Sequence, residues 1–125
     1  LVHQPAARPD ERRRERPMQR LTAETFDEAV REHPHLIVNF TADWCPDCRR
    51  IKDAYAGFPE RFPEIAFAVV DTEESPDLAE RFDVRGIPSL LVFRDGELID
   101  RLYSRDAKTV QQVEAFVTRQ LPVSS

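Results

Sequence analysis

Cysteine, glycine and long apolar runs are all scarce in this chain. Among its 125 residues are two cysteines and three glycines. Two cysteines are too few for the disulfide framework of a small secreted domain or for a four-cysteine zinc site. No segment approaches the roughly 18 apolar residues of a membrane span, and the N-terminus lacks the apolar core of a secretory signal. We therefore expect a cytoplasmic protein without membrane contact.

Charge divides the chain into two parts. Residues 1–20 carry six arginines against three acidic side chains, which leaves 12 basic and 20 acidic side chains in residues 21–125. Such an acidic domain lacks the basic face that offsets phosphate charge, so we expect neither nucleic acid nor an anionic membrane as a partner. We interpret residues 1–20 as an Arg-rich extension that is disordered or derived from expression cloning. Residues 21–125 are the size of one folded domain.

Hydrophobic patterning predicts a βαβ unit in the first half of this domain. Short, almost continuous apolar runs at residues 36–40 and 65–71 are typical of strands buried on both faces. Between them we predict a helix that starts at Cys45 and ends near Gly57, before Pro59. Strands joined by such a helix pair in parallel.

The rest of the domain completes an α/β pattern. A first helix is predicted over about residues 22–32 and a last one over about 107–120. Asp95-Gly96 predicts the turn of an antiparallel hairpin between strands at 89–93 and 97–103. We therefore expect a mixed central β-sheet flanked by helices on both faces.

The two cysteines lie close together in the pentapeptide Trp44-Cys45-Pro46-Asp47-Cys48, directly after the first buried strand. At the N-terminus of a helix, free N–H groups and the helix dipole stabilise a thiolate on Cys45, while Cys48 lies one turn further on and more buried. An exposed thiolate with a second thiol nearby is what dithiol-disulfide exchange requires. We predict Cys45 as the nucleophile and Cys48 as the resolving thiol.

A zinc site is the alternative use of the same cysteines. His33 and His35 could complete a tetrad with them. However, Pro34 and the strand that follows should carry both histidines to the far end of that strand. We therefore expect the histidines in a surface loop, and we expect no bound metal.

Three motifs occur in a fixed order: LIVNFTADWCPDC at 36–48, which includes the pentapeptide, VRGIPS at 84–89 and FRDGE at 93–97. Together they resemble the thioredoxin family over about residues 21–120, and above all its small bacterial members with a Trp-Cys-Pro-Asp-Cys site. The resemblance implies a thioredoxin-like fold. It also implies a cis Ile87–Pro88 peptide beside the sulfurs, pairing of the Ile87 backbone with a substrate strand, and Trp44 on the substrate-binding surface.

The chain departs from the family pattern below the cysteines. Typical thioredoxins have a buried carboxylate in the strand before the active site and a lysine partner on the neighbouring strand, where this chain has Asn39 and Val69. An amide cannot act as a general base. We therefore expect proton exchange at Cys48 to run through water, Asp43 or Asp47.

Two departures concern the substrate-binding side. Pro46-Asp47 replaces the usual Gly-Pro between the cysteines and places a negative charge near Cys45. We therefore expect a reducing rather than a strongly oxidising dithiol. In addition, the glycine that the family has in the substrate groove before the last helix has no counterpart here. We therefore do not assume that the protein acts on the usual thioredoxin substrates or docks with the usual reductase.

These features predict a thiol-disulfide oxidoreductase that reduces protein or low-molecular-weight disulfides through a Cys45–Cys48 dithiol/disulfide cycle. Its partners would be a disulfide-containing client and a separate thiol or thioredoxin-reductase-type electron donor, with no bound cofactor. We expect a monomer. The alternatives are a disulfide oxidant, an isomerase, a thiol peroxidase, or a binding module that presents Trp44 and Pro88 without turnover.

Overall fold

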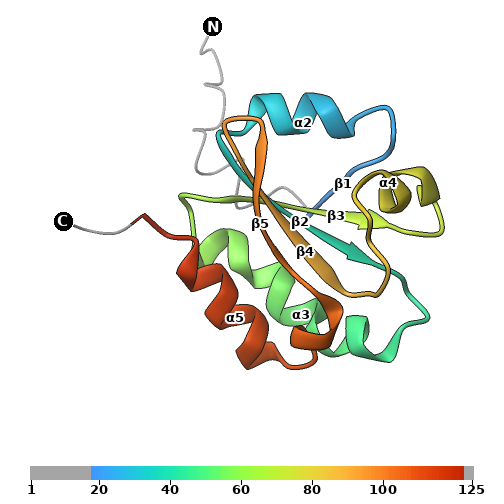
Figure 1. Cartoon of the computed structure of the whole chain (residues 1–125). Helices are drawn as coiled ribbons and strands as arrows, with labels where there is room; N and C mark the ends of the chain where they lie inside the picture. The colour runs from blue at the N-terminus through green and yellow to red at the C-terminus, as the bar shows by residue number, and fades with distance from the viewer. Residues whose placement is uncertain (1–17, 123–125) are drawn as a thin grey trace, which may run out of the picture.

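The computed structural model describes residues 18–122. Five strands form one mixed sheet in the order β1-β3-β2-β4-β5, with helices on both faces (Figure 1). This confirms the predicted α/β architecture. The elements are β1 (Gln19–Arg20), α2 (Phe26–Glu32), β2 (His35–Thr41), α3 (Pro46–Arg61), β3 (Ala66–Asp71), α4 (Pro76–Arg81), β4 (Ser89–Arg94), β5 (Glu97–Leu102), the 3₁₀ helix η1 (Ser104–Asp106) and α5 (Val110–Arg119).

Strand β2 lies at the centre of the sheet, parallel to β3 and antiparallel to β4. The β2-α3-β3 unit and the antiparallel β4-β5 hairpin both match the prediction. Six of the seven residues of β2 are buried, as expected for a strand covered on both faces. The end of this central strand therefore holds the segment that follows it, which contains both cysteines.

The side chains of the sheet contribute to two apolar cores, because successive residues of a strand point to opposite faces. In Figure 1, α3 and α5 lie together on one side of the sheet and α2 on the other. The first core joins α3 and α5 to the sheet through Ile37, Ile51, Tyr55, Phe58, Phe116 and Val117. The second joins α2 and α4 to it through Phe26, Val30, Leu36, Val38 and Leu78.

His35 corrects the prediction of a surface loop. It is the first residue of β2, pairs with Arg94 of β4 and is buried. Burial, together with the nearby Arg94 guanidinium, lowers the pKa of its imidazole. The apolar run starts only at Leu36, so the sequence pattern gave no sign that the strand pairing includes one more residue.

Helix α3 continues past Gly57 and Pro59 to Arg61, beyond its predicted end. Pro59 has no N–H for the Tyr55 carbonyl, which is the usual reason for a helix to stop. Here the last turn is held by aromatic packing on β3, with the ring centroids of Phe58 and Phe62 at 5.9 Å and 6.4 Å from that of Phe67. These tertiary contacts outweigh the local preference of proline.

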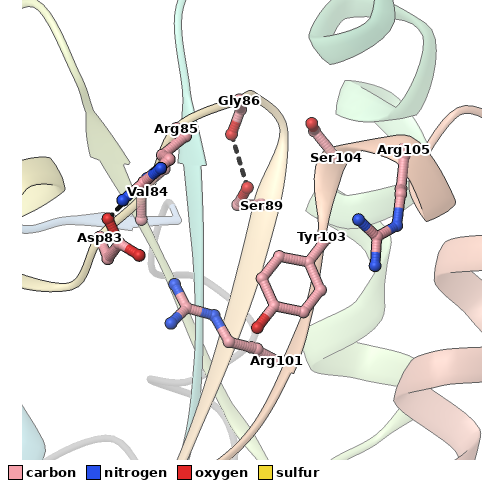
Figure 2. A pocket seen from close by; sticks show the side chains of 9 residues that line it. All are labelled: Asp83, Val84, Arg85, Gly86, Ser89, Arg101, Tyr103, Ser104 and Arg105. Carbon is pink, nitrogen blue, oxygen red and sulfur yellow. Dashed lines mark hydrogen bonds and ion pairs between the residues drawn. The ribbon is translucent and has the colours of Figure 1, made fainter.

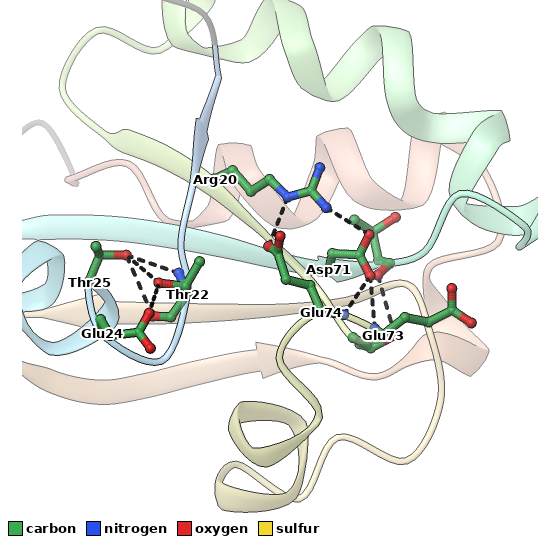
Figure 3. A network of polar contacts seen from close by, with 9 residues as sticks. Arg20, Thr22, Glu24, Thr25, Asp71, Glu73 and Glu74 are labelled. Atoms are coloured by element: carbon green, nitrogen blue, oxygen red, sulfur yellow. Dashed lines mark hydrogen bonds and ion pairs between the residues drawn. The ribbon is translucent and has the colours of Figure 1, made fainter.

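Helices α2 and α5 both start later than predicted, at Phe26 and Val110. Residues 22–25 instead form a turn in which the Thr22 N–H donates to the Thr25 hydroxyl at 2.9 Å (Figure 3). Helix α5 begins with a capping box, because Thr109 accepts from the Gln112 N–H at 3.1 Å and Gln112 accepts from the Thr109 N–H at 3.1 Å.

The folded domain includes Met18–Arg20, which the sequence prediction assigned to the N-terminal extension. Strand β1 pairs in parallel with β3, and Met18 packs against the core of α3 and α5. Arg20 forms ion pairs with Asp71 at 3.1 Å and Glu74 at 3.0 Å (Figure 3). A strand of two residues is too short to give a periodic signal. The rest of the predicted extension, residues 1–17, lies outside the described residues.

The buried Tyr55 hydroxyl fastens α3 to the sheet. It lies 2.8 Å from the Ala68 carbonyl of β3 and 3.1 Å from the Ile37 carbonyl of β2. Burial raises the pKa of this hydroxyl, so it remains a donor. Since both cysteines lie at the start of α3, these hydrogen bonds help to fix the position of the cysteines relative to the sheet.

Replacing Tyr55 by phenylalanine is expected to lower the free energy of unfolding by about 1–2 kcal/mol, because buried carbonyls lose their donor. Urea denaturation measures the change. Tyr103→Phe is the matched control, because Tyr103 is the only other tyrosine and is exposed. Equal losses in the two variants would contradict the anchoring role of the Tyr55 hydroxyl.

Candidate active site

Cys45 is the N-cap of helix α3, and its sulfur is held by the first turn of that helix. The Cys45 Sγ accepts a hydrogen bond from the Cys48 N–H at 3.4 Å. Pro46 follows as the first helical residue, where its missing N–H leaves no bond unmade. The positive end of the helix dipole therefore favours negative charge on this sulfur.

The loop before β4 closes over the same sulfur from a distant part of the chain. The Cys45 thiol donates to the Ile87 carbonyl at 3.7 Å, and the Ile87–Pro88 peptide bond is cis, as the resemblance implied. Because this loop lies against the sulfur, Cys45 is only 5% exposed. The expected exposed position of Cys45 is therefore not what the structure shows.

Cys48 lies one helical turn further on and is 3% exposed. Burial raises the pKa of its thiol to about 11, and hydrogen bonding to Cys45 adds to this, while Thr41 and the Ala42 backbone act in the opposite direction. Both cysteines are free thiols. At neutral pH, Cys48 is therefore held in its protonated form.

Trp44 and Asp43 precede the cysteines on the outside of the molecule. The indole of Trp44 is 59% exposed, although it is the only tryptophan of the chain and is large and apolar. Asp43 is exposed as well. An exposed aromatic ring next to a reactive sulfur offers apolar contact area to a bound chain.

Asp47 does not act as an isolated negative charge beside Cys45. Its carboxylate lies 2.6 Å from Arg50 and 3.0 Å from Lys108, and Arg50 also donates to the Lys108 carbonyl at 2.8 Å. Hydrogen bonds from Lys108 and Arg50 lower the pKa of Asp47. Two cations thus offset its charge, and a carboxylate held ionised in this way is a poor proton acceptor.

Sequence reasoning missed Arg50 and Lys108 for different reasons. Arg50 lies three residues after Asp47, a spacing at which opposite charges on a helix commonly pair. Lys108 is separated from Asp47 by 61 positions and precedes α5, so no local pattern links the two residues. Only the packing of α5 beside α3 brings this lysine to the site.

Asn39 and Val69 are neighbours in the sheet, as the comparison with the family pattern implied. They pair directly between β2 and β3. Asn39 is buried, and within residues 18–122 its Oδ1 has no hydrogen-bond partner. This pair thus provides neither a carboxylate nor a lysine.

The histidines lie at the opposite end of β2 from the cysteines. His35 begins the strand and Cys45 follows its other end, and the rise of a strand places these ends about 20 Å apart. Within the described part of the chain, no group of three or more histidine, cysteine or acidic side chains could hold a metal ion.

Among the residues that the structure describes, no helix is long and apolar enough to cross a membrane.

Comparison with known proteins identifies the family. The thioredoxin family model matches residues 17–119. The chain belongs to the thioredoxin family. It is 36% identical over 89 residues to Thioredoxin-2 of Pyricularia oryzae, covering 71% of this chain and 52% of that protein. It is 30% identical over 94 residues to Thioredoxin-1 of Saccharomyces cerevisiae, covering 75% and 91% of the two chains.

Solved structures confirm the thioredoxin fold. A thioredoxin of Plasmodium falciparum superposes with a TM-score of 0.77 at 22% identity, covering 83% of this chain and all of that one. This chain spans about half the length of the Pyricularia relative. The comparisons therefore establish the family and the fold.

The raised pKa of Cys48 predicts a pH dependence for its alkylation. In Cys45→Ser, Cys48 is the only cysteine, and burial, the largest cause of its raised pKa, remains, so its thiolate is scarce at neutral pH. We expect iodoacetamide to label it slowly at pH 7 and faster with each unit of pH, as followed by mass spectrometry. Cys48→Ser, which keeps Cys45 at the helix N-terminus, is the control and should react faster at pH 7. Equally fast labelling of Cys48 at pH 7 would contradict the effect of burial.

Proposed function

We propose that this chain is a thiol-disulfide oxidoreductase that reduces disulfides of proteins or small molecules. The observation that carries the proposal is the position of the Cys45 sulfur. It lies at the N-cap of α3, accepts the Cys48 N–H at 3.4 Å and lies against the Ile87 carbonyl at 3.7 Å. A helix terminus that favours a thiolate, with a second thiol one turn away, supports Cys45 as nucleophile and Cys48 as resolving thiol.

The proposed reaction transfers two electrons and two protons to the substrate. The Cys45 thiolate attacks one substrate sulfur, the substrate disulfide bond breaks, and the other substrate sulfur leaves as a thiolate that takes up a proton. Cys48 then loses its proton and attacks the Cys45 sulfur of the mixed disulfide, which releases the second substrate thiol. The Cys45–Cys48 disulfide that remains is restored by a separate thiol or a reductase-type donor, so no bound cofactor is required.

Trp44, Ile87 and Pro88 are proposed to hold the substrate chain. In the thiol form, Cys45 donates to the Ile87 carbonyl. A Cys45 thiolate has no proton to donate, so this carbonyl then becomes available to a backbone N–H of the substrate. The exposed Trp44 indole would cover the apolar part of the same chain.

The proton of Cys48 is proposed to leave through water or Asp43. Asn39 cannot accept it as a base, and Asp47 is engaged by Arg50 and Lys108. Reduction of disulfides by this dithiol would suit a compartment where thiols are kept reduced. We propose the cytoplasm as that compartment and a monomer as the working unit.

Reduction of insulin tests the function. With dithiothreitol as electron donor, we expect the wild type to accelerate insulin precipitation and Cys45→Ser to give only the uncatalysed rate. In a separate reaction without dithiothreitol, prereduced Cys48→Ser mixed with oxidised insulin should accumulate a mixed disulfide through Cys45, seen as a mass increase that later addition of dithiothreitol reverses. Turnover by Cys45→Ser would refute the assigned roles. A wild type at background would instead favour a binding module without turnover.

Replacing Asn39 by aspartate tests the effect of a buried carboxylate at the position where this chain has an amide. The buried carboxylate would be favoured in its protonated form, so stability should be retained at low pH and lost as pH rises. We expect a loss on the order of 3 kcal/mol at pH 8 and a smaller loss at pH 5, measured by urea denaturation. Adding Val69→Lys should recover part of the loss, because the two residues pair directly.

The single variant Asn39→Asp should also resolve the mixed disulfide faster, because the aspartate can accept the Cys48 proton. Quenched-flow measurement of the mixed disulfide gives this rate. Asn39→Leu is the control for a change of packing alone. A rate that is the same in all three proteins would show that proton removal from Cys48 does not limit the resolving step.

A further inference from the structure

A pocket of about 440 Å³ lies beside the loop that covers Cys45 (Figure 2). Gly86 and Ser89, the residues on either side of Ile87–Pro88, form one wall of it. The end of β5 and the 3₁₀ helix η1 form the opposite wall. The pocket is therefore next to the place where the proposed function puts the substrate disulfide.

The two walls are held close together by small residues. A Cβ atom at Gly86 would collide with the Ser104 hydroxyl and lie 3.1 Å from the Ser104 Cβ, so glycine allows the two walls to approach closely here. The Ser89 hydroxyl donates to the Gly86 carbonyl at 2.5 Å across the cis peptide. The position of the pocket relative to the cysteines is thus fixed by the same loop that contacts Cys45.

The lining of this pocket is basic, in contrast to the acidic chain with its net charge of −5. Arg85, Arg101 and Arg105 line it, against the single acidic residue Asp83. Asp83 pairs with Arg85 at 2.8 Å. Two guanidinium groups thus remain to attract an anion.

Arg101 and Arg105 are oriented by the ring of Tyr103. Each guanidinium carbon lies 5.2 Å from the centroid of this ring. Arg101 uses one of its several N–H groups on the Phe82 carbonyl at 2.6 Å. Arg105 lies 3.7 Å from Asp106, beyond hydrogen-bond distance, and is largely exposed. Both arginines therefore keep donors for a ligand.

We infer that this pocket binds a carboxylate that the substrate carries close to its disulfide, so that the protein selects acidic disulfide substrates. The inference rests on the proposed function. Carboxylates are the anionic groups that a peptide chain carries, and planar guanidinium groups bind them with paired hydrogen bonds. A chain that pairs with Ile87 would bring its neighbouring side chains to the pocket, one residue away.

Three synthetic peptides with one internal disulfide test the inference. They share one sequence, except that the residues flanking each cysteine are all glutamate, all glutamine or all lysine. Protein reduced beforehand is mixed with an equal amount of oxidised peptide, and the second-order rate constant is taken from chromatography of quenched samples. We expect the wild type to reduce the glutamate peptide about three to ten times faster than the glutamine peptide at low salt, with a smaller ratio at 0.5 M NaCl.

Arg105→Gln should lower the ratio of the glutamate rate to the glutamine rate toward one. Arg105→Glu should turn the preference toward the lysine peptide, a gain that loss of folding cannot imitate. Arg31→Gln is the matched control, because Arg31 is exposed on α2 and does not line the pocket. Its ratio should equal that of the wild type.

The outcomes separate this inference from the proposed function. Equal rate constants for the three peptides in the wild type would overturn the inference and leave the reductase activity standing. A ratio that Arg105→Gln and Arg105→Glu do not change would overturn it as well. A wild type that reduces none of the peptides would refute the proposed function, and the inference with it.

Discussion

The site depends on the two hydrogen bonds that hold the Cys45 sulfur between backbone groups. One group is the Cys48 N–H at the start of α3, and the other is the Ile87 carbonyl of a loop 42 positions away. The sulfur can occupy this position only if the end of β2 and the start of β4 are adjacent, which their antiparallel pairing ensures. The Cys48 N–H is already directed at the sulfur before charge develops on it, so the fold itself prepares this atom for reaction.

Charge around the dithiol is balanced by contacts between distant segments. Asp47 would oppose a thiolate on Cys45, but Lys108 and Arg50 offset it. Below the cysteines, Asn39 provides a buried polar group without a charge. The Cys48 N–H lies against the Cys45 sulfur, while burial raises the pKa of Cys48 and keeps it protonated. Cys45 can thus attack the substrate first and Cys48 can attack the mixed disulfide afterwards, which is the order of steps in a disulfide exchange.

The surface around the site combines an apolar and a basic region. Trp44 offers an exposed ring on one side of the sulfur. On the other side, beyond the Ile87–Pro88 loop, the pocket carries Arg101 and Arg105. An overall acidic protein repels acidic partners at a distance, so a local basic pocket would act mainly at close range. Such a division would make recognition depend on the residues next to the substrate disulfide.

The sequence by itself determined the order of strands and helices, the central place of β2, and the two cysteines at a helix start, because these follow from local apolar patterns and spacing. It did not indicate the two-residue strand β1, the burial of His35 or the extension of α3 through Pro59. Only the tertiary structure decided the burial of Cys45, the ion pair of Asp47 with Lys108 and the basic pocket. Each of these joins residues far apart in the chain, and such contacts exist only once the sheet has brought its segments together.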